Sequence, residues 1–287
     1  MEASRPSGTA ERIAFMRALH LLVDDDPKIF GDPLAEAFLS PEQATVLKTT
    51  PQAFQTPEMR SLRAVFVVRQ RYAEDELVKA LARGVSQYVI LGAGLDSFAY
   101  RRVDLRQTVH VYEVDHPASQ HWKRQRLTEL GIALPDNLTF IPIDFEVQTL
   151  AAGMAASSFN PHEPAFFSWL GVTQYLTTEA VLSTLRYVAS STAPGSEIVF
   201  QIILSPSSLS GEDQAVVTVA SRHAAQHGEP WQSFFEPITL EAQLRAMGFT
   251  QVLHFTPAEA TTLYFHGRTD GLRLPNYFEL IRARIGL

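Results

Sequence analysis

QYVILGAGLDSFAYRR, residues 87–102, joins a β-branched apolar run to a turn that contains two glycines. Glycine tolerates positive φ and has no Cβ, so a turn built on Gly92 and Gly94 lets the backbone approach a ligand closely. A dinucleotide-binding fingerprint has a third glycine where this chain has Ser97, so the turn lacks the pattern that binds a pyrophosphate. The stretch predicts a strand, a ligand-binding turn and a helix. A plain strand-to-helix loop is the alternative.

Strand and helix patterns alternate after this turn, which is typical of a parallel sheet covered on both faces. Strands are expected at 88–92, 108–114, 138–144, 165–170 and 197–204, with helices at about 117–130, 146–157 and 178–191. Two further short strands are expected at 249–255 and 261–267, and a terminal helix at 276–287. We therefore predict an α/β fold with a doubly wound, seven-stranded, mostly parallel sheet.

The remaining segments have helical spacing of apolar residues and predict a helical cap. The expected organisation is an N-terminal helical cap (1–83), a cofactor-binding α/β core (84–204), a helical cap insertion (205–237) and a C-terminal completion of the core sheet (238–287).

The composition is that of an ordinary globular protein, with 46% hydrophobic and 19% charged residues. The net charge of −7 and the lack of a Lys/Arg run argue against nucleic acid as the partner. The absence of cysteine excludes disulfides and thiolate sites, and the sequence predicts no metal site. Charged residues interrupt the N-terminal apolar pattern, and no apolar run approaches the ~20 residues of a membrane helix. We expect a cytoplasmic protein with a small-molecule partner and no membrane contact; a homo-oligomer is compatible with the sequence.

Acidic residues end the second and third expected strands. Glu113 and Asp115 follow Gly94 by 19 and 21 residues, close to the roughly 20-residue spacing of a ribose-binding carboxylate. Residues two apart in a strand share a face, so both carboxylates are expected to point the same way. Asp144 and Phe145 end the third strand, and a carboxylate beside an aromatic ring suits adenine. These residues predict an adenosine site without a diphosphate; solvated strand ends are the alternative.

Several segments form a recognisable set: YVILGAGLDSFAYR, YEVDHPASQHWKRQRL, FIPIDFE, FFSWLGVTQYLT and YFHGRTDGLRLP, with VVRQRYAEDEL before the first strand. Together they resemble the leucine carboxyl methyltransferase family, and most closely its bacterial O-methyltransferase branch. The likeness runs over nearly the whole chain. It implies a Rossmann-like class I methyltransferase fold with S-adenosyl-L-methionine as the cofactor.

The resemblance also implies roles by position. Gly92 and Gly94 would pass under the methionine part of the cofactor, Asp115 with Glu113 beside it would hold the ribose hydroxyls, and Asp144 with Phe145 would hold the adenine. An arginine from the N-terminal region binds the cofactor carboxylate in the family, and Arg69 or Arg71 matches it; bidentate guanidinium binding suits a carboxylate. A solvated helix face is the alternative for either arginine.

Two positions need separate treatment. Asp96, within the family's "GLD" pattern, is expected to cap the following helix or to receive the cofactor's ammonium. Many members have a glutamate–glycine pair where this chain has Leu170 and Gly171. This chain therefore lacks the carboxylate that those members have at this position.

The acceptor pocket is expected above the fourth and fifth strands, between the cap segments and the last hairpin. Its candidate residues are Trp169, Gln174, Tyr175, Tyr264, His266 and Arg268. Tyr175 and Arg268 are expected to orient the acceptor through a hydrogen bond and a guanidinium–anion contact. A carboxylate is already ionised at neutral pH, whereas a hydroxyl acceptor would use a base such as His266. Core aromatics and a surface ion pair are the alternative.

The predicted function is S-adenosylmethionine-dependent O-methylation of a carboxylate on a small molecule or peptide, in secondary metabolism. A hydroxyl or phenol acceptor, and a cofactor-binding protein without methylation, are the alternatives. A nicotinamide-dependent oxidoreductase is disfavoured by Ser97 and by the absence of a Tyr-x-x-x-Lys pair.

Overall fold

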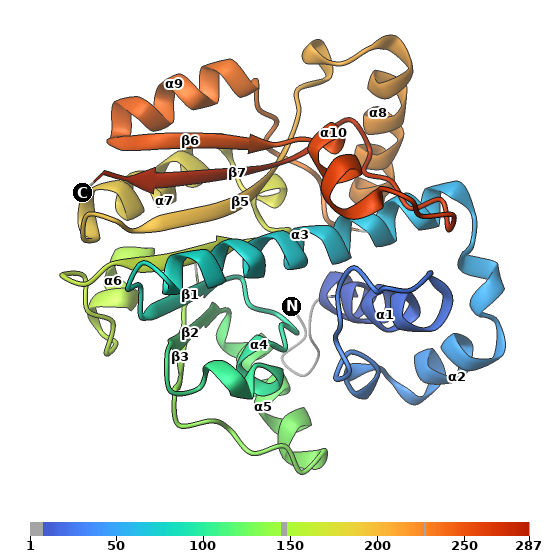
Figure 1. The fold of residues 1–287 in the computed structure, drawn as a ribbon, viewed down its shortest axis with the longest axis horizontal. Coiled ribbons are helices and arrows are strands. Elements are labelled where there is room, and N and C mark those ends of the chain that lie inside the picture. Colours follow the sequence, from blue (N-terminus) through green and yellow to red (C-terminus); the bar gives the residue numbers. More distant parts are fainter. Residues whose placement is uncertain (1–7, 145–147, 227, 287) are drawn as a thin grey trace.

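The computed structural model describes residues 8–144, 148–226 and 228–286, and a seven-stranded sheet lies at its centre (Figure 1). The strands are β1 (Gln87–Leu91), β2 (His110–Asp115), β3 (Leu138–Pro142), β4 (Ala165–Trp169), β5 (Glu197–Ile203), β6 (Phe249–Phe255) and β7 (Phe278–Ile285). Their order is β3-β2-β1-β4-β5-β7-β6. The first five are parallel, and β7 is antiparallel to β5 and β6. The predicted doubly wound, mostly parallel sheet is confirmed.

Alternating side chains of β1 divide the core between the two faces of the sheet. Tyr88 and Ile90 pack in one cluster with apolar residues of α3 (Pro57–Leu81) and α1 (Gly8–Val23). Val89 and Leu91 pack in the other, with α6 (Leu150–Ala155), α7 (Thr178–Ser191) and α9 (Pro237–Met247). β1, β4 and β5 are buried along their whole length, as expected when helices cover both faces of a parallel sheet, whereas the edge strand β3 is mostly half-buried.

Further helices precede or connect the strands. They are α2 (Pro41–Thr49), the short α4 (Phe98–Arg101) after β1, α5 (Pro117–Glu129) after β2 and α8 (Gly211–Gln226) after β5. In Figure 1, α1, α2 and α8 all lie beyond the same end of the strands. None of the helices in the described part of the chain is both long and apolar enough to cross a membrane.

The C-terminal region differs from the prediction in two places. The segment expected to be a terminal helix forms β7, and the segment expected to be a strand at 261–267 is helical, with α10 (Pro257–Ala260) running into a π-helical turn at Thr261–Phe265. A capping box between Thr256 and Glu259 starts that helix. Both faces of β7 pack in the core, with Phe278 and Leu280 in one cluster and Ile281 and Ala283 in the other, so its sequence lacks the alternation that indicates a strand.

Candidate functional site

A cavity of about 840 Å³ lies at the carboxyl ends of β1, β2 and β4, where ligands of open α/β sheets bind. Its walls come from the glycine turn, the ends of β2 and β4, α3, the first turns of α1 and the loop after α8. Small-molecule sites span roughly 300–1,000 Å³, so this cavity is near the upper end of the range. Seven of the predicted site residues line it: Arg69, Gly92, Gly94, Asp96, Asp115, Asp144 and Tyr175.

The glycine turn forms the floor of the cavity. Gly92 and Gly94 have φ of +69° and +45°. A Cβ on Gly92 would lie 2.4 Å from Cγ2 of Val172, so the turn has room only for glycine there. The backbone N–H of Gly94 donates to Oδ2 of Asp115, which fixes the turn against the end of β2.

Asp115 is the carboxylate that the sequence placed at the ribose. Its Oδ1 accepts from the backbone N–H of His116 at 2.6 Å, and burial raises its pKa above the usual range. The hydrogen bonds from the Gly94 and His116 amides oppose that shift. Each carboxylate oxygen has one backbone partner, which leaves acceptor capacity toward the cavity.

Glu113 does not line the cavity with Asp115, contrary to the expectation that it lies beside Asp115 at the ribose. Its side chain is fully buried and forms an ion pair with Lys123 on α5 at 2.7 Å. Burial raises the pKa of Glu113 to about 7, although Lys123 opposes the shift. Asp115 is the last residue of β2 and reaches the cavity, whereas Glu113 lies two residues earlier and meets Lys123 inside the core.

Asp144 lies at the far end of the cavity, half-buried, with Oδ2 3.7 Å from Nε2 of His116. His116 caps α5, since its Nδ1 accepts from the backbone N–H of Ala118. The imidazole is therefore oriented by the start of the helix. Phe145, the predicted adenine neighbour, lies outside the described residues.

Asp96 is buried at the side of the turn. Its Oδ1 accepts from the backbone N–H of Phe98, the first residue of α4, at 2.7 Å, although the residue at the N-cap position is Ser97. Its Oδ2 accepts from Nε2 of Gln70 at 2.6 Å. Nothing in these contacts neutralises the carboxylate.

Arg69 and Arg71 lie on the same helix but have different surroundings. Arg69 is buried against the cavity, with Nη1 donating to Oε1 of Gln201 at 2.9 Å and Cζ 4.8 Å from the ring centre of Phe66. Burial lowers its pKa to about 10, so the guanidinium stays charged at neutral pH. Arg71 is exposed and pairs with Asp75, and it does not line the cavity. The geometry therefore favours Arg69 for the role that the sequence left open between them.

The residues predicted around the acceptor are only partly brought together. Tyr175 is half-buried in the cavity wall. Trp169 is 3% exposed and packs in the core, which agrees with the alternative of a core aromatic. Gln174 is buried, and its backbone carbonyl accepts from the backbone N–H of Gln232 in the loop after α8. Neither Trp169 nor Gln174 lines the cavity.

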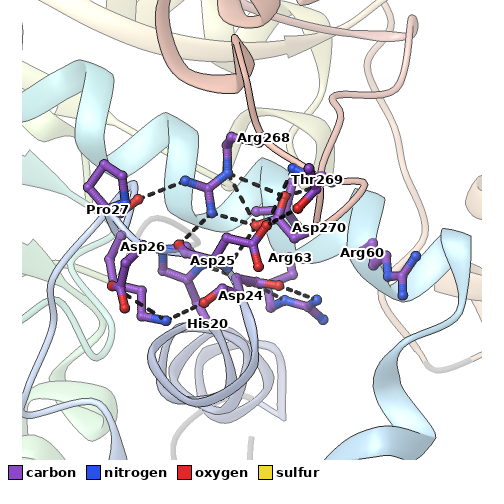
Figure 2. A network of polar contacts seen from close by, with 12 residues as sticks. His20, Asp24, Asp25, Asp26, Pro27, Arg60, Arg63, Arg268, Thr269 and Asp270 are labelled. Carbon is purple, nitrogen blue, oxygen red and sulfur yellow. Dashed lines mark hydrogen bonds and ion pairs between the residues drawn. The ribbon is translucent and has the colours of Figure 1, made fainter.

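Tyr264, His266 and Arg268 lie away from the cavity, contrary to the prediction. The Tyr264 hydroxyl donates to Asp75 at 2.9 Å, and His266 is exposed. Figure 2 shows the guanidinium of Arg268 against the turn after α1, where it donates to the carbonyls of Asp25 and Pro27 and pairs with Asp270. The helical conformation of 261–265, in place of the expected strand, gives this segment a different path.

The sequence interpretation missed several cavity residues. Arg17 on α1 donates from Nη2 to the carbonyl of Leu95 at 2.6 Å and is 3% exposed. The helical spacing of Ala10, Ile13 and Arg17, which all line the cavity, is the signal that could have identified this face. Thr9 at the start of the same face donates to Glu229, so α1 and the loop after α8 meet over the cavity.

Comparisons with known proteins show which family the chain resembles. A family model described as "Leucine carboxyl methyltransferase" matches residues 10–189. A Bacillus subtilis (strain 168) protein named "Putative S-adenosyl-L-methionine-dependent methyltransferase YktD" is 31% identical over an alignment of 296 positions, which covers 95% of each chain. A Mycobacterium avium (strain 104) protein of the same general name is 33% identical over 211 residues, or 70% of this chain and 68% of the relative.

Two solved structures share the fold. A "putative methyltransferase" from Thermobifida fusca YX has a TM-score of 0.56 at 16% identity and covers 100% of this chain and 97% of its own. A DUF574 family protein from Streptomyces avermitilis has a TM-score of 0.52 at 15% identity, with 94% and 96% coverage. At these identities the likeness is one of fold.

Proposed function

Because the chain belongs to the leucine carboxyl methyltransferase family and is an S-adenosylmethionine-dependent methyltransferase, we propose that it methylates an oxygen of a small molecule or peptide, and that this oxygen belongs to a carboxylate. The observation that carries the proposal is the gathering of Arg69, Asp96, Asp115 and Asp144 around the glycine turn in one cavity.

The cavity fits S-adenosylmethionine on its own evidence. Arg69 is a buried cation that has no carboxylate ion pair within the described residues. At Gly92 an added Cβ would collide with Val172, so only glycine lets the backbone line the cavity there. In this proposal Arg69 binds the carboxylate of the methionine part and Asp96 its ammonium, above Gly92 and Gly94. Asp115 accepts from the ribose hydroxyls and Asp144 from the adenine amine.

When bound, S-adenosylmethionine supplies a methyl group on a sulfonium, and transfer to a carboxylate forms a neutral ester without releasing a proton. The residues of the chain then need to align the acceptor and exclude water. Tyr175 offers a hydroxyl in the cavity wall, and α1 with the loop after α8 closes over the site through Thr9 and Glu229.

Two features favour a carboxylate over a hydroxyl. His116 is the only histidine among the described lining residues, and it lies beside Asp144 at the proposed adenine end. Within the described residues no imidazole therefore lines the proposed transfer site, and an acceptor that is already ionised needs none. Arg17 adds a second guanidinium to the cavity, although Asp32 lies 3.3 Å from its Nε.

The test is to incubate the protein with S-adenosylmethionine carrying a labelled methyl group and matched sets of carboxylates and phenols. We expect label to enter the carboxylates and to be released as methanol in mild alkali, because esters hydrolyse there. Alkali-stable label in the phenols would favour hydroxyl methylation. Cofactor binding without turnover of any acceptor would favour a binding protein that does not methylate.

A further inference from the structure

Two opposite charges project into the cavity, and each is held by a glutamine. Nη1 of Arg69 donates to Oε1 of Gln201 at 2.9 Å, and Oδ2 of Asp96 accepts from Nε2 of Gln70 at 2.6 Å. Arg69 is 4% exposed and Asp96 8%. Across residues 8–144, 148–226 and 228–286, neither forms an ion pair.

Several other buried charges among the described residues have a partner of opposite sign. Arg63 pairs with Asp24 at 2.7 Å, and Lys123 pairs with Glu113 at the same distance. Burying a charge without a counter-charge is costly, so the arrangement at Arg69 and Asp96 differs from that of Arg63 and Lys123. A neutral amide can orient a charged group without neutralising it, which leaves the charge available to a ligand.

The orientation of each amide follows from its partners. A guanidinium only donates hydrogen bonds, so Gln201 must present its oxygen to Arg69. The amide nitrogen of Gln70 donates to Asp96 and, at 3.4 Å, to Glu74, so its two hydrogens face carboxylates. Gly171 and the ring of Phe66 complete the seat of Arg69.

We propose that Gln201 and Gln70 are positioning residues of a zwitterion-binding subsite, in which Arg69 receives the carboxylate and Asp96 the ammonium of an α-amino acid group. The inference rests on the proposed function, where that group is the methionine end of the cofactor. Because each charged group is hydrogen-bonded to a neutral amide and not to a counter-ion, both stay available to a ligand that has a carboxylate and an ammonium.

Two probes separate this role from a structural one. S-adenosylhomocysteine carries the amino acid group, and 5′-methylthioadenosine has the same nucleoside without it. In Gln201→Glu the new carboxylate forms an ion pair with Arg69 in nearly the same volume. We expect affinity for S-adenosylhomocysteine, measured by calorimetry, to fall about tenfold or more, in keeping with a lost bond to a charged group. Affinity for 5′-methylthioadenosine should stay within about twofold of wild type.

Gln70→Leu tests the ammonium side, with the same selective loss expected. Gln120→Leu is the control: Gln120 is buried on α5, donates to the carbonyls of Glu113 and Ile141, and lies outside the cavity. It should lower stability and leave the ratio of the two affinities unchanged.

Equal losses for both probes in Gln201→Glu and Gln70→Leu, or no loss for either, would overturn the positioning role while the proposed function stands. Wild-type protein that binds neither probe would overturn the proposed function and this inference together. If Gln201→Glu does not fold, the same comparison in Gln201→Met decides, because methionine removes the acceptor without adding a charge.

Discussion

Arg69 and Gly171 occupy adjoining space so tightly that a Cβ on Gly171 would lie 2.4 Å from Nη1 and 2.8 Å from Cζ of Arg69. Gly171 also has φ of +74°, a conformation that side chains other than glycine rarely adopt. The segment after β4 therefore supplies the seat of the guanidinium, although the two residues are far apart in sequence.

Gly171→Ala should displace the guanidinium of Arg69. We expect at least a tenfold loss of S-adenosylhomocysteine affinity, on the order of a lost charged hydrogen bond, and about 1 kcal/mol or more of lost stability from the positive φ. Calorimetry and urea unfolding measure the two effects. Gly131→Ala is the control, because its φ of +67° imposes similar strain while no atom lies within 4 Å of the new Cβ. Wild-type affinity in Gly171→Ala would show that Arg69 does not bind the ligand.

Asp144→Ala should weaken cofactor binding by about 1.5–3 kcal/mol, the range for a hydrogen bond to a charged group. The fold should persist, because Asp144 lies beyond the end of β3. Calorimetric titration with S-adenosylhomocysteine measures the loss, and Asp136→Ala, an exposed aspartate before β3, should bind as wild type. Equal affinity in the two variants would place the adenine elsewhere.

The pH dependence of the rate distinguishes the acceptors. With a carboxylate acceptor the rate should be nearly constant from about pH 6 to 9, because the acceptor's pKa of ~4 lies below that window. The pKa of Arg69, about 10 after burial, lies above it. An imidazole base would instead give a rising limb near pH ~6.5. Such a limb, lost in His116→Gln and retained in the exposed His266→Gln, would contradict the carboxylate assignment.

The buried pair of Glu113 and Lys123 should make stability fall with rising pH. Burial raises the pKa of Glu113 from 4.5 to about 7 on folding, so the folded state binds the proton more tightly than the unfolded chain. The resulting stabilisation is complete below about pH 4.5 and is lost as pH rises through about 7. Urea unfolding at pH 5 and pH 8 should show a smaller difference for Glu113→Gln combined with Lys123→Met than for wild type. The same difference in both proteins would exclude this contribution.

The parts of the site that local pattern could predict are the strand ends. Gly92, Asp115 and Asp144 lie at or just after the ends of strands whose apolar runs are visible in the sequence. The parallel topology then brings these residues to one edge of the sheet. The strands from β1 to β5 begin and end within about two residues of the expected positions for the same reason.

The parts that sequence alone could not predict depend on distant contacts. Gln201 lies 132 residues from Arg69, and nothing in its own strand indicates the contact. Arg268 has the charge of an anion-binding residue, but carbonyls of the turn after α1 and the carboxylate of Asp270, two residues further along the chain, engage it. β7 was misassigned because both of its faces are covered in the folded protein, so its sequence does not alternate between apolar and polar residues.

The position of β7 between β5 and β6 has a consequence for biosynthesis. A ribosome produces β6 before β7, yet in the described sheet β6 pairs with β7 alone. The emerging polypeptide therefore holds β6 without a partner, and β5 keeps an open edge, until the residues from Phe278 onward have left the exit tunnel. Open strand edges favour association between chains. We expect nascent chains in which β6 has left the tunnel and β7 has not to rely on chaperones to stay unaggregated.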